Sequence, residues 1–149
     1  MRAVIQRVSQ ASVSVEGQVI GTIGKGFMIL LGVGPNDTEE DLDYMVRKIT
    51  RLRVFTDDQD KMNLDIFSVG GELLVISQFT LYANTKKGNR PSFTEAGAPD
   101  FSKEMYLKFI DRCRALGLKV EEGEFGTHMA VSLINDGPVT ITMDSTQRL

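Results

Sequence analysis

The residue types best suited to chemistry follow one apolar run near the middle of the chain. The run Leu73-Leu74-Val75-Ile76 is followed at once by two hydroxyls, an amide and an aromatic ring: Ser77, Gln78, Phe79 and Thr80. Four successive apolar residues after the Gly70-Gly71 turn signal favour a strand buried on both faces over a short buried helix. Because buried polar groups need hydrogen-bond partners, the polar cluster is either a satisfied structural network or the floor of a functional site.

The chemistry open to this cluster centres on Thr80. Its hydroxyl is a candidate nucleophile, and a covalent route through it is chemically possible. Such a route needs a general base, and the sequence offers no obvious His or Asp partner for Thr80. The main-chain N–H groups around Phe79 and Thr80, at the end of a rigid strand, are a second source of catalysis, because preorganised donors stabilise a developing oxyanion.

A second polar stretch, Asn135-Asp136-Gly137-Pro138, lies between two expected strands at 129–134 and 139–143. Its composition favours a tight hairpin turn. The Gly137–Pro138 bond is also the place where a cis peptide is least unfavourable, at about 0.5–1 kcal/mol relative to trans. The residue types alone leave both readings open.

Several common kinds of site are excluded by count or spacing. His128 is the only histidine and Cys113 the only cysteine, so a zinc site built from His and Cys cannot form. The aspartates at 57–60 lack the Gly and Glu of an EF-hand loop, and the glycines at 24–34 match no phosphate-binding loop. Cys113 sits on an apolar helix face without a nearby base and is expected in the core. We expect no metal and no cofactor.

Length and composition predict one domain spanning residues 1–149. The net charge is −3 and the pI about 5.2, which argues against broad electrostatic binding to a nucleic-acid backbone. It does not argue against an enzyme that binds only one end of an RNA. Arg2 and Arg7 interrupt the first apolar run, so it is not a signal peptide. No apolar run approaches the roughly 18 residues of a membrane span. The single cysteine fits a reducing compartment, and we expect a cytoplasmic protein without membrane partners.

The elements that must position these residues are mostly strands. Alternation predicts strands at 2–8 and 11–16, and the Glu16-Gly17 turn joins the second of these to a partner at 19–23, so 11–23 is expected to form a hairpin. The continuous apolar run at 27–33 predicts a central strand. Short strands are also expected at 53–55 and 119–121.

Two helices are expected. The first begins after Asp37 or Thr38, and its apolar face is formed by residues at spacings of three and four: Leu42, Met45, Val46, Ile49 and Leu52. Asp100 is the expected N-cap of the second, which Gly117 closes. Residues 144–149 form a polar tail that we expect to be frayed.

The loop between 84 and 98 is locally positive in an acidic protein. Its cations are Lys86, Lys87 and Arg90. The loop is either simply solvated or contacts phosphate.

Taken together, Ser77-Gln78-Phe79-Thr80-Leu81 and Asn135-Asp136-Gly137-Pro138-Val139-Thr140 closely resemble the motifs of the D-aminoacyl-tRNA deacylases. Either motif alone is weak, but both occur in the family's order. Further likeness lies at 5–8, 61–64, 90–93 and 131–133, so that the resemblance spans nearly the whole chain. Gly126-Thr127-His128 and the extended tail are less typical of the family.

The resemblance implies an α/β fold of two packed, barrel-like β-sheets with a layer of two helices, working as a homodimer with active sites at the subunit interface. It implies a hydrolase for chiral proofreading, which cleaves the ester between a D-amino acid and the 3′-terminal adenosine of tRNA and also removes glycine mischarged on tRNA. In the family, the Gly-Pro dipeptide, here Gly137-Pro138, is cis and enters the pocket of the other subunit.

Residue roles follow from the same resemblance. Ser77, Gln78, Phe79 and Thr80 are the expected catalytic stretch. We expect water to attack the ester with help from the tRNA 2′-hydroxyl. Thr80 is expected to have a positioning role or to donate a hydrogen bond. Gly137 and Pro138 form a main-chain wall that rejects L-amino acids yet admits glycine, and Arg7 braces it. Phe125 and Met129 are expected to line the adenosine pocket.

Two alternatives stay open. The first is an esterase in which Thr80 is the nucleophile. The second, from a different class, is a non-catalytic dimeric module that binds tRNA or a nucleotide.

Overall fold

The computed structural model describes residues 1–148 and is organised around one long strand, β1 (Arg2–Val15). On one side β1 pairs first with β3 (Gly26–Gly32) and then with β2 (Gln18–Ile23). On its other side it pairs with β8 (Ala130–Asp144) over nearly its whole length. All three pairings are antiparallel. Two separate strands were predicted for 2–8 and 11–16; they form one strand, and the predicted 11–23 hairpin is confirmed.

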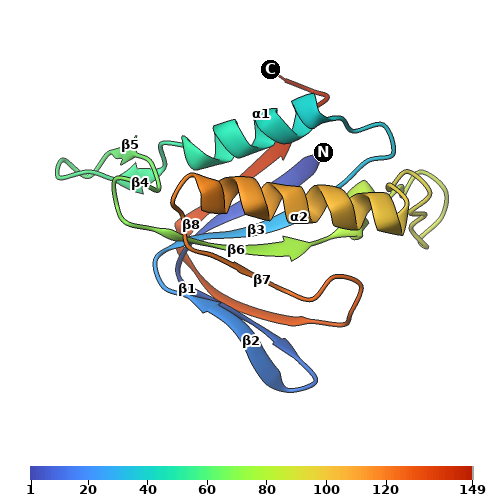
Figure 1. Cartoon of the computed structure of the whole chain (residues 1–149), viewed down its shortest axis with the longest axis horizontal. Coiled ribbons are helices and arrows are strands. Elements are labelled where there is room, and N and C mark those ends of the chain that lie inside the picture. The colour runs from blue at the N-terminus through green and yellow to red at the C-terminus, as the bar shows by residue number, and fades with distance from the viewer. Residues whose placement is uncertain (149) are drawn as a thin grey trace.

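The sheet continues from β3 through two parallel strands, β6 (Glu72–Ser77) and β7 (Val120–Glu122). Leu73, Leu74 and Val75 are fully buried, so β6 is the strand covered on both faces that its apolar run predicts. Parallel strands need crossover connections, and helices α1 (Glu39–Thr50) and α2 (Pro99–Ala115) lie in those connections. Figure 1 shows both helices on one side of the sheet, with β1, β2 and β8 curling away on the other.

Two apolar clusters fill the faces of this curved sheet. The larger lies between the sheet and the helices, and includes Phe27, Ile29, Val75 and Phe109. The smaller lies inside the curl and consists of Val8, Ala11, Val13, Ile23, Met28, Leu74 and Ile76. A small second sheet pairs β4 (Phe55–Thr56) with β5 (Met62–Leu64). The predicted fold class, α/β with barrel-like sheet and two helices, is confirmed.

The helix starts were predicted with mixed success. Thr38 is the N-cap of α1, and the Asp41 side chain accepts a hydrogen bond from the Thr38 main-chain N–H at 2.9 Å, as in a capping box. The predicted N-cap of α2, Asp100, is wrong: Ala98 is the N-cap and Pro99 is the first helical residue. Proline suits that position because its fixed φ matches the helix and it lacks an N–H that would need a partner.

The stretch 135–138 does not form the hairpin that its composition favours. Asn135 pairs with Val8 and Thr140 pairs with Gln6. Four residues of β8, 136–139, therefore lie opposite the single residue Arg7 of β1, and β8 stays paired with β1 on both sides of them. The chain bulges outward here rather than reversing. The Gly137–Pro138 peptide bond is cis. We call residues 135–138 the Gly-Pro corner.

The two ends of the chain meet beside α1. The Met1 ammonium donates hydrogen bonds to Asp37 Oδ1 and Ser145 Oγ, both at 2.7 Å, and the Ser145 N–H donates to the Met1 carbonyl at 2.8 Å. Of the tail expected to be frayed, Ser145 contacts Met1 and Arg148 contacts Asp41, whereas Leu149 lies outside the described residues. Within residues 1–148, neither helix is long and apolar enough to cross a membrane.

Candidate active site

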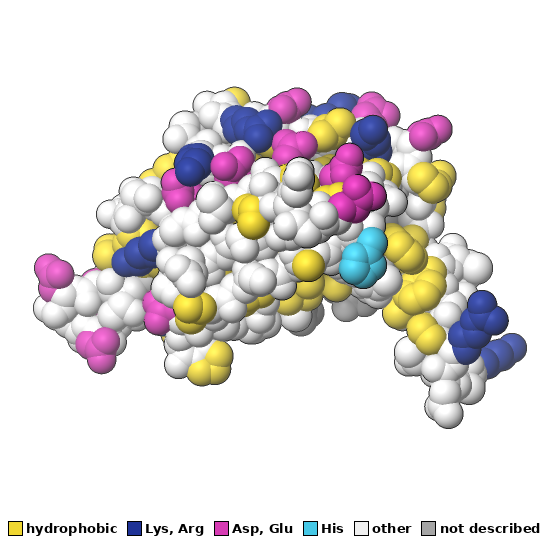
Figure 2. Space-filling model, turned by 90° about the horizontal axis from the view of Figure 1, so that it is seen from below, with side chains coloured by type: hydrophobic (Ala, Val, Ile, Leu, Met, Phe, Trp, Pro, Cys, Tyr) yellow, Lys and Arg dark blue, Asp and Glu magenta, His cyan; other side chains and the backbone are white. Residues whose placement is uncertain are grey.

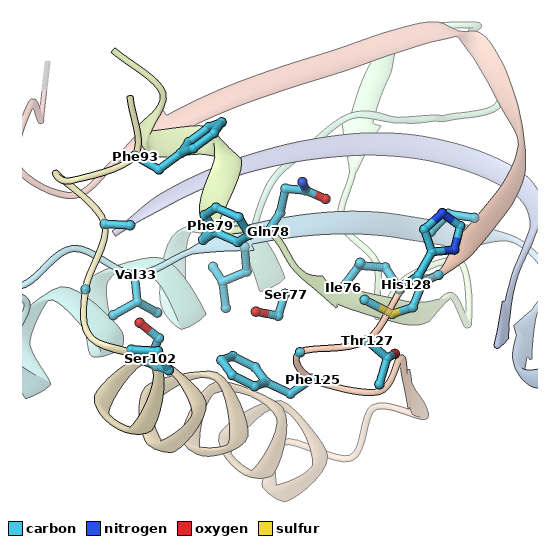
Figure 3. Close-up of a pocket in the computed structure, with 17 residues that line it drawn as sticks. Val33, Ile76, Ser77, Gln78, Phe79, Phe93, Ser102, Phe125, Thr127 and His128 are labelled. Carbon is cyan, nitrogen blue, oxygen red and sulfur yellow. The ribbon is translucent and has the colours of Figure 1, made fainter. Parts of the chain in front are cut away.

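A cavity of about 580 Å³ opens at the carboxyl ends of β3 and β6. It lies between the end of β6, the loop before α2 and the segment that leads into β8 (Figure 3). Its volume is within the range of small-molecule sites, and its lining is largely apolar with a few polar groups. On the face in Figure 2, apolar side chains gather beside the single histidine, His128, which lines this cavity.

One wall is built where β6 ends. The Gln78 N–H donates to the Leu31 carbonyl at 2.8 Å, which holds Gln78 against the neighbouring strand β3. The chain then enters a 3-10 helix, η1 (Phe79–Tyr82), rather than continuing as a strand. Ser77, Gln78 and Phe79 line the cavity. Thr80 does not, but its hydroxyl accepts a hydrogen bond from the Gln78 side-chain amide.

This turn leaves two main-chain donors without acceptors in the part of the chain that the structure describes: the N–H of the cavity residue Phe79 and that of the next residue, Thr80. The first N–H groups of a helical turn have no acceptor within it. Within residues 1–148, no hydrogen bond is donated by the N–H of Phe79 or of Thr80. These are the two groups that the sequence suggests as oxyanion donors.

The aromatic ring of Phe79 stands at the cavity mouth. Phe79 is 56% exposed, which is unusual for phenylalanine, and its ring meets the ring of Phe93 edge-on at a centroid distance of 5.2 Å. Phe93 also lines the cavity, from the loop before α2. The two rings therefore form an accessible aromatic surface above the cavity (Figure 3).

The opposite wall comes from the segment between β7 and β8. Phe125 and Met129, the predicted adenosine-pocket residues, both line the cavity. Phe125 packs on Tyr106 of α2 at a ring distance of 6.0 Å, and the Tyr106 hydroxyl donates to the Val75 carbonyl of β6 at 2.8 Å. Burial raises the pKa of Tyr106 well above its usual value, so that the hydroxyl stays a donor. This bond ties α2 to the strand that forms the cavity floor.

The remaining predicted site residues form a separate group at the Gly-Pro corner. Arg7 is only 8% exposed; its Nε donates to the Asp136 carbonyl at 2.9 Å and its Nη1 to the Val54 carbonyl at 2.7 Å. The Val139 N–H donates to Asn135 Oδ1 at 2.8 Å across the corner. Gly137 and Pro138 are exposed and do not line the cavity of their own chain.

Phe93, Ser102 and His128 are among the cavity residues that sequence reasoning missed. Phe93 lies in the 90–93 stretch that resembles the deacylases, which was the one available signal. Ser102 is on the first turns of α2, and nothing in a single sequence places that helix beside β6. Within residues 1–148, no group of three or more His, Cys, Asp or Glu side chains is arranged to hold a metal ion.

Comparison with known proteins gives a consistent answer. Residues 4–144 match the family described as D-Tyr-tRNA(Tyr) deacylase. The D-aminoacyl-tRNA deacylase of Thermosipho africanus is 54% identical over 145 residues, covering 97% of each chain. That of Lacticaseibacillus casei is 56% identical over 145 residues, covering 97% of this chain and 98% of the relative.

Two solved structures share the fold. One, named c-Myc DNA Unwinding Element Binding Protein, has a TM-score of 0.91 and 41% identity, covering 97% of this chain and 98% of its own. Another, described as a probable eukaryotic D-amino acid tRNA deacylase, has a TM-score of 0.83 at 18% identity, covering 95% and 97% of the two chains, and supports the fold alone. The chain belongs to the D-Tyr-tRNA(Tyr) deacylase family.

Proposed function

We propose that this protein is a D-aminoacyl-tRNA deacylase, a hydrolase that cleaves the ester between a D-amino acid and the 3′-terminal adenosine of tRNA. The observation that carries the proposal is the cavity at the end of β6, where the motif Ser77-Gln78-Phe79 meets Phe125 and Met129. Residues that are far apart in the sequence, and that resemble one family's motifs, line one site of suitable size. The relatives named as D-aminoacyl-tRNA deacylases match nearly the full chain.

The proposed chemistry is attack by water on the ester carbonyl. Oxygen of the water bonds to the carbonyl carbon, the carbonyl oxygen becomes an oxyanion, and the N–H groups of Phe79 and Thr80 donate to it. One preorganised donor contributes about 2.7–4 kcal/mol to such a transition state. The tetrahedral intermediate then collapses: the bond to the ribose oxygen breaks, that oxygen takes a proton, and a D-amino acid and tRNA leave. The neighbouring ribose 2′-hydroxyl assists by relaying to the departing ribose 3′-oxygen the proton that the attacking water loses.

Thr80 fits a positioning role better than that of a nucleophile. Its hydroxyl is bonded to the Gln78 amide, and within residues 1–148 it has no hydrogen bond to a His, Asp or Glu that could act as its base. Without a base, a threonine hydroxyl is a weak nucleophile.

The apolar walls suit the terminal adenosine. Phe125 and Met129 offer a flat ring and an adaptable thioether on one side of the cavity. Phe125 is held in place by Tyr106, which makes it a rigid contact for a base. The aminoacyl group would then lie towards Phe79 at the mouth.

Rejection of L-amino acids requires a rigid wall, because losing a side-chain contact changes affinity by only about 1–3 kcal/mol. In this proposal the Gly-Pro corner of a second copy of the chain supplies the wall, so the active form is a homodimer. The corner's position supports this: it is exposed, held by Arg7 and Asn135, and absent from the cavity of its own chain. Its carbonyls would hold the substrate ammonium group. A wall that excludes a side chain by shape admits glycine, so glycyl-tRNA is also a substrate.

The test is deacylation of matched D-tyrosyl-tRNA and L-tyrosyl-tRNA by the purified protein. We expect release of D-tyrosine at a rate proportional to enzyme, with the L-ester as stable as in buffer. Equal hydrolysis of the two enantiomers would contradict the proposal of a chiral wall. If neither ester is hydrolysed, the proposed deacylase activity is wrong.

A second candidate function is nucleic-acid binding without catalysis. It is favoured by one observation, the 41% identity to a protein named for binding a DNA unwinding element. The acidic net charge argues against it, because duplex binding is normally driven by a basic surface. Binding of charged tRNA without any deacylation would support this second candidate.

A further inference from the structure

We infer that the loop at residues 84–92 binds the phosphate backbone of the tRNA acceptor end and holds the terminal nucleotide over the cavity. We call this segment the basic loop. The inference rests on the proposed function and extends it from the reacting ester to the RNA that carries it.

The two ends of the basic loop are hydrogen-bonded to each other, and the chain on either side of the loop contributes to the cavity. The Asn84 N–H donates to the Ser92 carbonyl at 2.7 Å, and the Ser92 N–H donates to the Asn84 carbonyl at 2.9 Å. The loop follows η1, which carries Phe79, and it ends just before Phe93, so both aromatic rings at the cavity mouth flank it. The basic loop is therefore anchored at both ends beside residues that line the cavity.

The tip of the loop is shaped by its own hydrogen bonds. The Asn84 side chain accepts from the Lys86 N–H at 2.9 Å, and Gly88 turns the chain with φ of +66°. Such a turn leaves Lys86, Lys87 and Arg90 exposed at the tip. Figure 2 shows Lys and Arg side chains gathered on a projection at the edge of the apolar surface.

Half of the other lysines and arginines of residues 1–148 pair with a carboxylate, whereas none of these three does. Lys108, Arg112 and Lys119 each pair with a carboxylate. No carboxylate of residues 1–148 lies within 4 Å of the charged groups of the basic loop. The sequence has no Asp or Glu between Glu72 and Glu95. The basic loop therefore places three exposed cations, which have no carboxylate partners among residues 1–148, beside the cavity of an acidic protein.

RNA phosphate is the partner that fits this arrangement. Lysine and arginine neutralise backbone phosphates without reading the base sequence. Exposed aromatic rings beside a basic segment are the usual platform for single-stranded bases, and the tRNA acceptor ends in unpaired nucleotides. The small patch explains how a protein of net charge −3 can still hold one RNA end.

The test compares two triple variants with equal charge change. The first is Lys86→Ala/Lys87→Ala/Arg90→Ala. The matched control, Arg47→Ala/Lys48→Ala/Arg51→Ala, removes three exposed cations from α1 and its end, away from the residues that line the cavity. Each protein is assayed with D-tyrosyl-tRNA and with D-tyrosyl-adenosine, which has the ester and base but no phosphate. Binding of uncharged tRNA is measured in parallel by fluorescence anisotropy at several salt concentrations.

For the loop variant we expect KM for D-tyrosyl-tRNA to rise at least about tenfold with kcat unchanged, and turnover of D-tyrosyl-adenosine to equal that of the natural protein. The log–log salt slope of tRNA binding should fall by about 2, since each phosphate contact on a single strand contributes about 0.7. The control variant should stay within about twofold of the natural protein on every measure.

Three results would overturn the inference: an unchanged KM and salt slope, an equal loss in the control variant, or a loss with D-tyrosyl-adenosine as large as with tRNA. If the natural protein hydrolyses neither substrate, the proposed function fails. The anisotropy comparison would still decide whether the basic loop binds RNA.

Discussion

Thr80 is the residue whose role separates the two catalytic schemes. In the water-attack scheme its hydroxyl only supports the Gln78 side chain. Thr80→Ala should then lower kcat on D-tyrosyl-tRNA by no more than about tenfold, because a typical hydrogen bond contributes about 0.5–1.5 kcal/mol. Single-turnover assays at saturating enzyme measure this directly. Loss of all activity in Thr80→Ala, with activity kept in Thr80→Ser, would point to the nucleophile instead.

Cys113 illustrates a reactive residue type made inert by its place in the core. It is fully buried on α2, and burial raises the pKa of its thiol to about 12. The folded protein should therefore not react with a thiol reagent such as 5,5′-dithiobis(2-nitrobenzoate) at pH 8. One thiol should appear on addition of guanidinium chloride. Rapid labelling under native conditions would mean that α2 opens locally.

At this scale, the motif residues named from the sequence include several that the structure brings to one cavity. Ser77, Gln78 and Phe79 line the cavity, and so do Phe125 and Met129 from the far wall. Sequence reasoning failed for Ser102 and His128, because a cavity formed by packing a helix against a strand end leaves no local pattern. The N–H groups of Phe79 and Thr80 were anticipated, but the 3-10 turn that leaves them without partners was not.

Among the elements, the Gly-Pro corner departs most from its local pattern. Asn-Asp-Gly-Pro is turn composition, yet β8 stays paired with β1 on both sides of the corner. The decisive contacts are non-local: Arg7, on the partner strand, binds the Asp136 and Val54 carbonyls. A single sequence does not show which distant side chain satisfies these groups. By contrast, β6 and α1 follow from their own periodicity.

Arg7→Ala should destabilise the protein because it leaves two carbonyls without their charged donor. Hydrogen bonds to charged groups contribute about 1.5–3 kcal/mol, and we expect a loss of that size in the free energy of unfolding. Urea denaturation followed by circular dichroism measures it. The matched control is Arg53→Ala, which removes an exposed arginine bonded to Asn63 and should change stability by less than about 0.5 kcal/mol. Equal effects of the two substitutions would contradict a bracing role for Arg7.

Glu72 links the start of β6 to neighbouring elements through its carboxylate. The Gly24 N–H donates to Glu72 Oε1 at 2.8 Å and Lys119 lies 3.2 Å from Oε2. The Gly24 hydrogen bond, helped by Lys119, lowers the pKa of Glu72 below its usual value.

A lowered pKa stabilises the folded state above the unfolded-state pKa, and this contribution disappears as pH falls through the folded-state pKa. Glu72→Gln should therefore be less stable than the natural protein at pH 7, and the difference should shrink as pH falls below about 4.5. Thermal unfolding from pH 3 to pH 7 tests this. A difference that is constant across that range would show that the charge of Glu72 is not responsible.

For the whole molecule, the arrangement of the two groups of site residues is the central fact. The cavity and the Gly-Pro corner both carry family motifs, yet Gly137 and Pro138 do not line the cavity of their own chain. A homodimer of twofold symmetry would bring each corner to the other chain's cavity and make two equal sites. The family resemblance predicted the fold class, whereas the distance of Gly137 and Pro138 from the cavity of their own chain is seen only in the three-dimensional structure.

Complementation between two inactive variants tests this claim most directly. In Gly137→Ala, the new Cβ would lie 2.8 Å from the Val139 side chain at a backbone φ of +145°, which displaces the corner. Gln78→Ala alters the cavity wall. When the two are co-expressed with different tags, each hybrid dimer has one site in which both parts are intact. A purified hybrid should deacylate D-tyrosyl-tRNA at about half the natural rate, because one of its two symmetric sites is complete. A hybrid that forms but is no more active than its inactive parents would contradict the shared site.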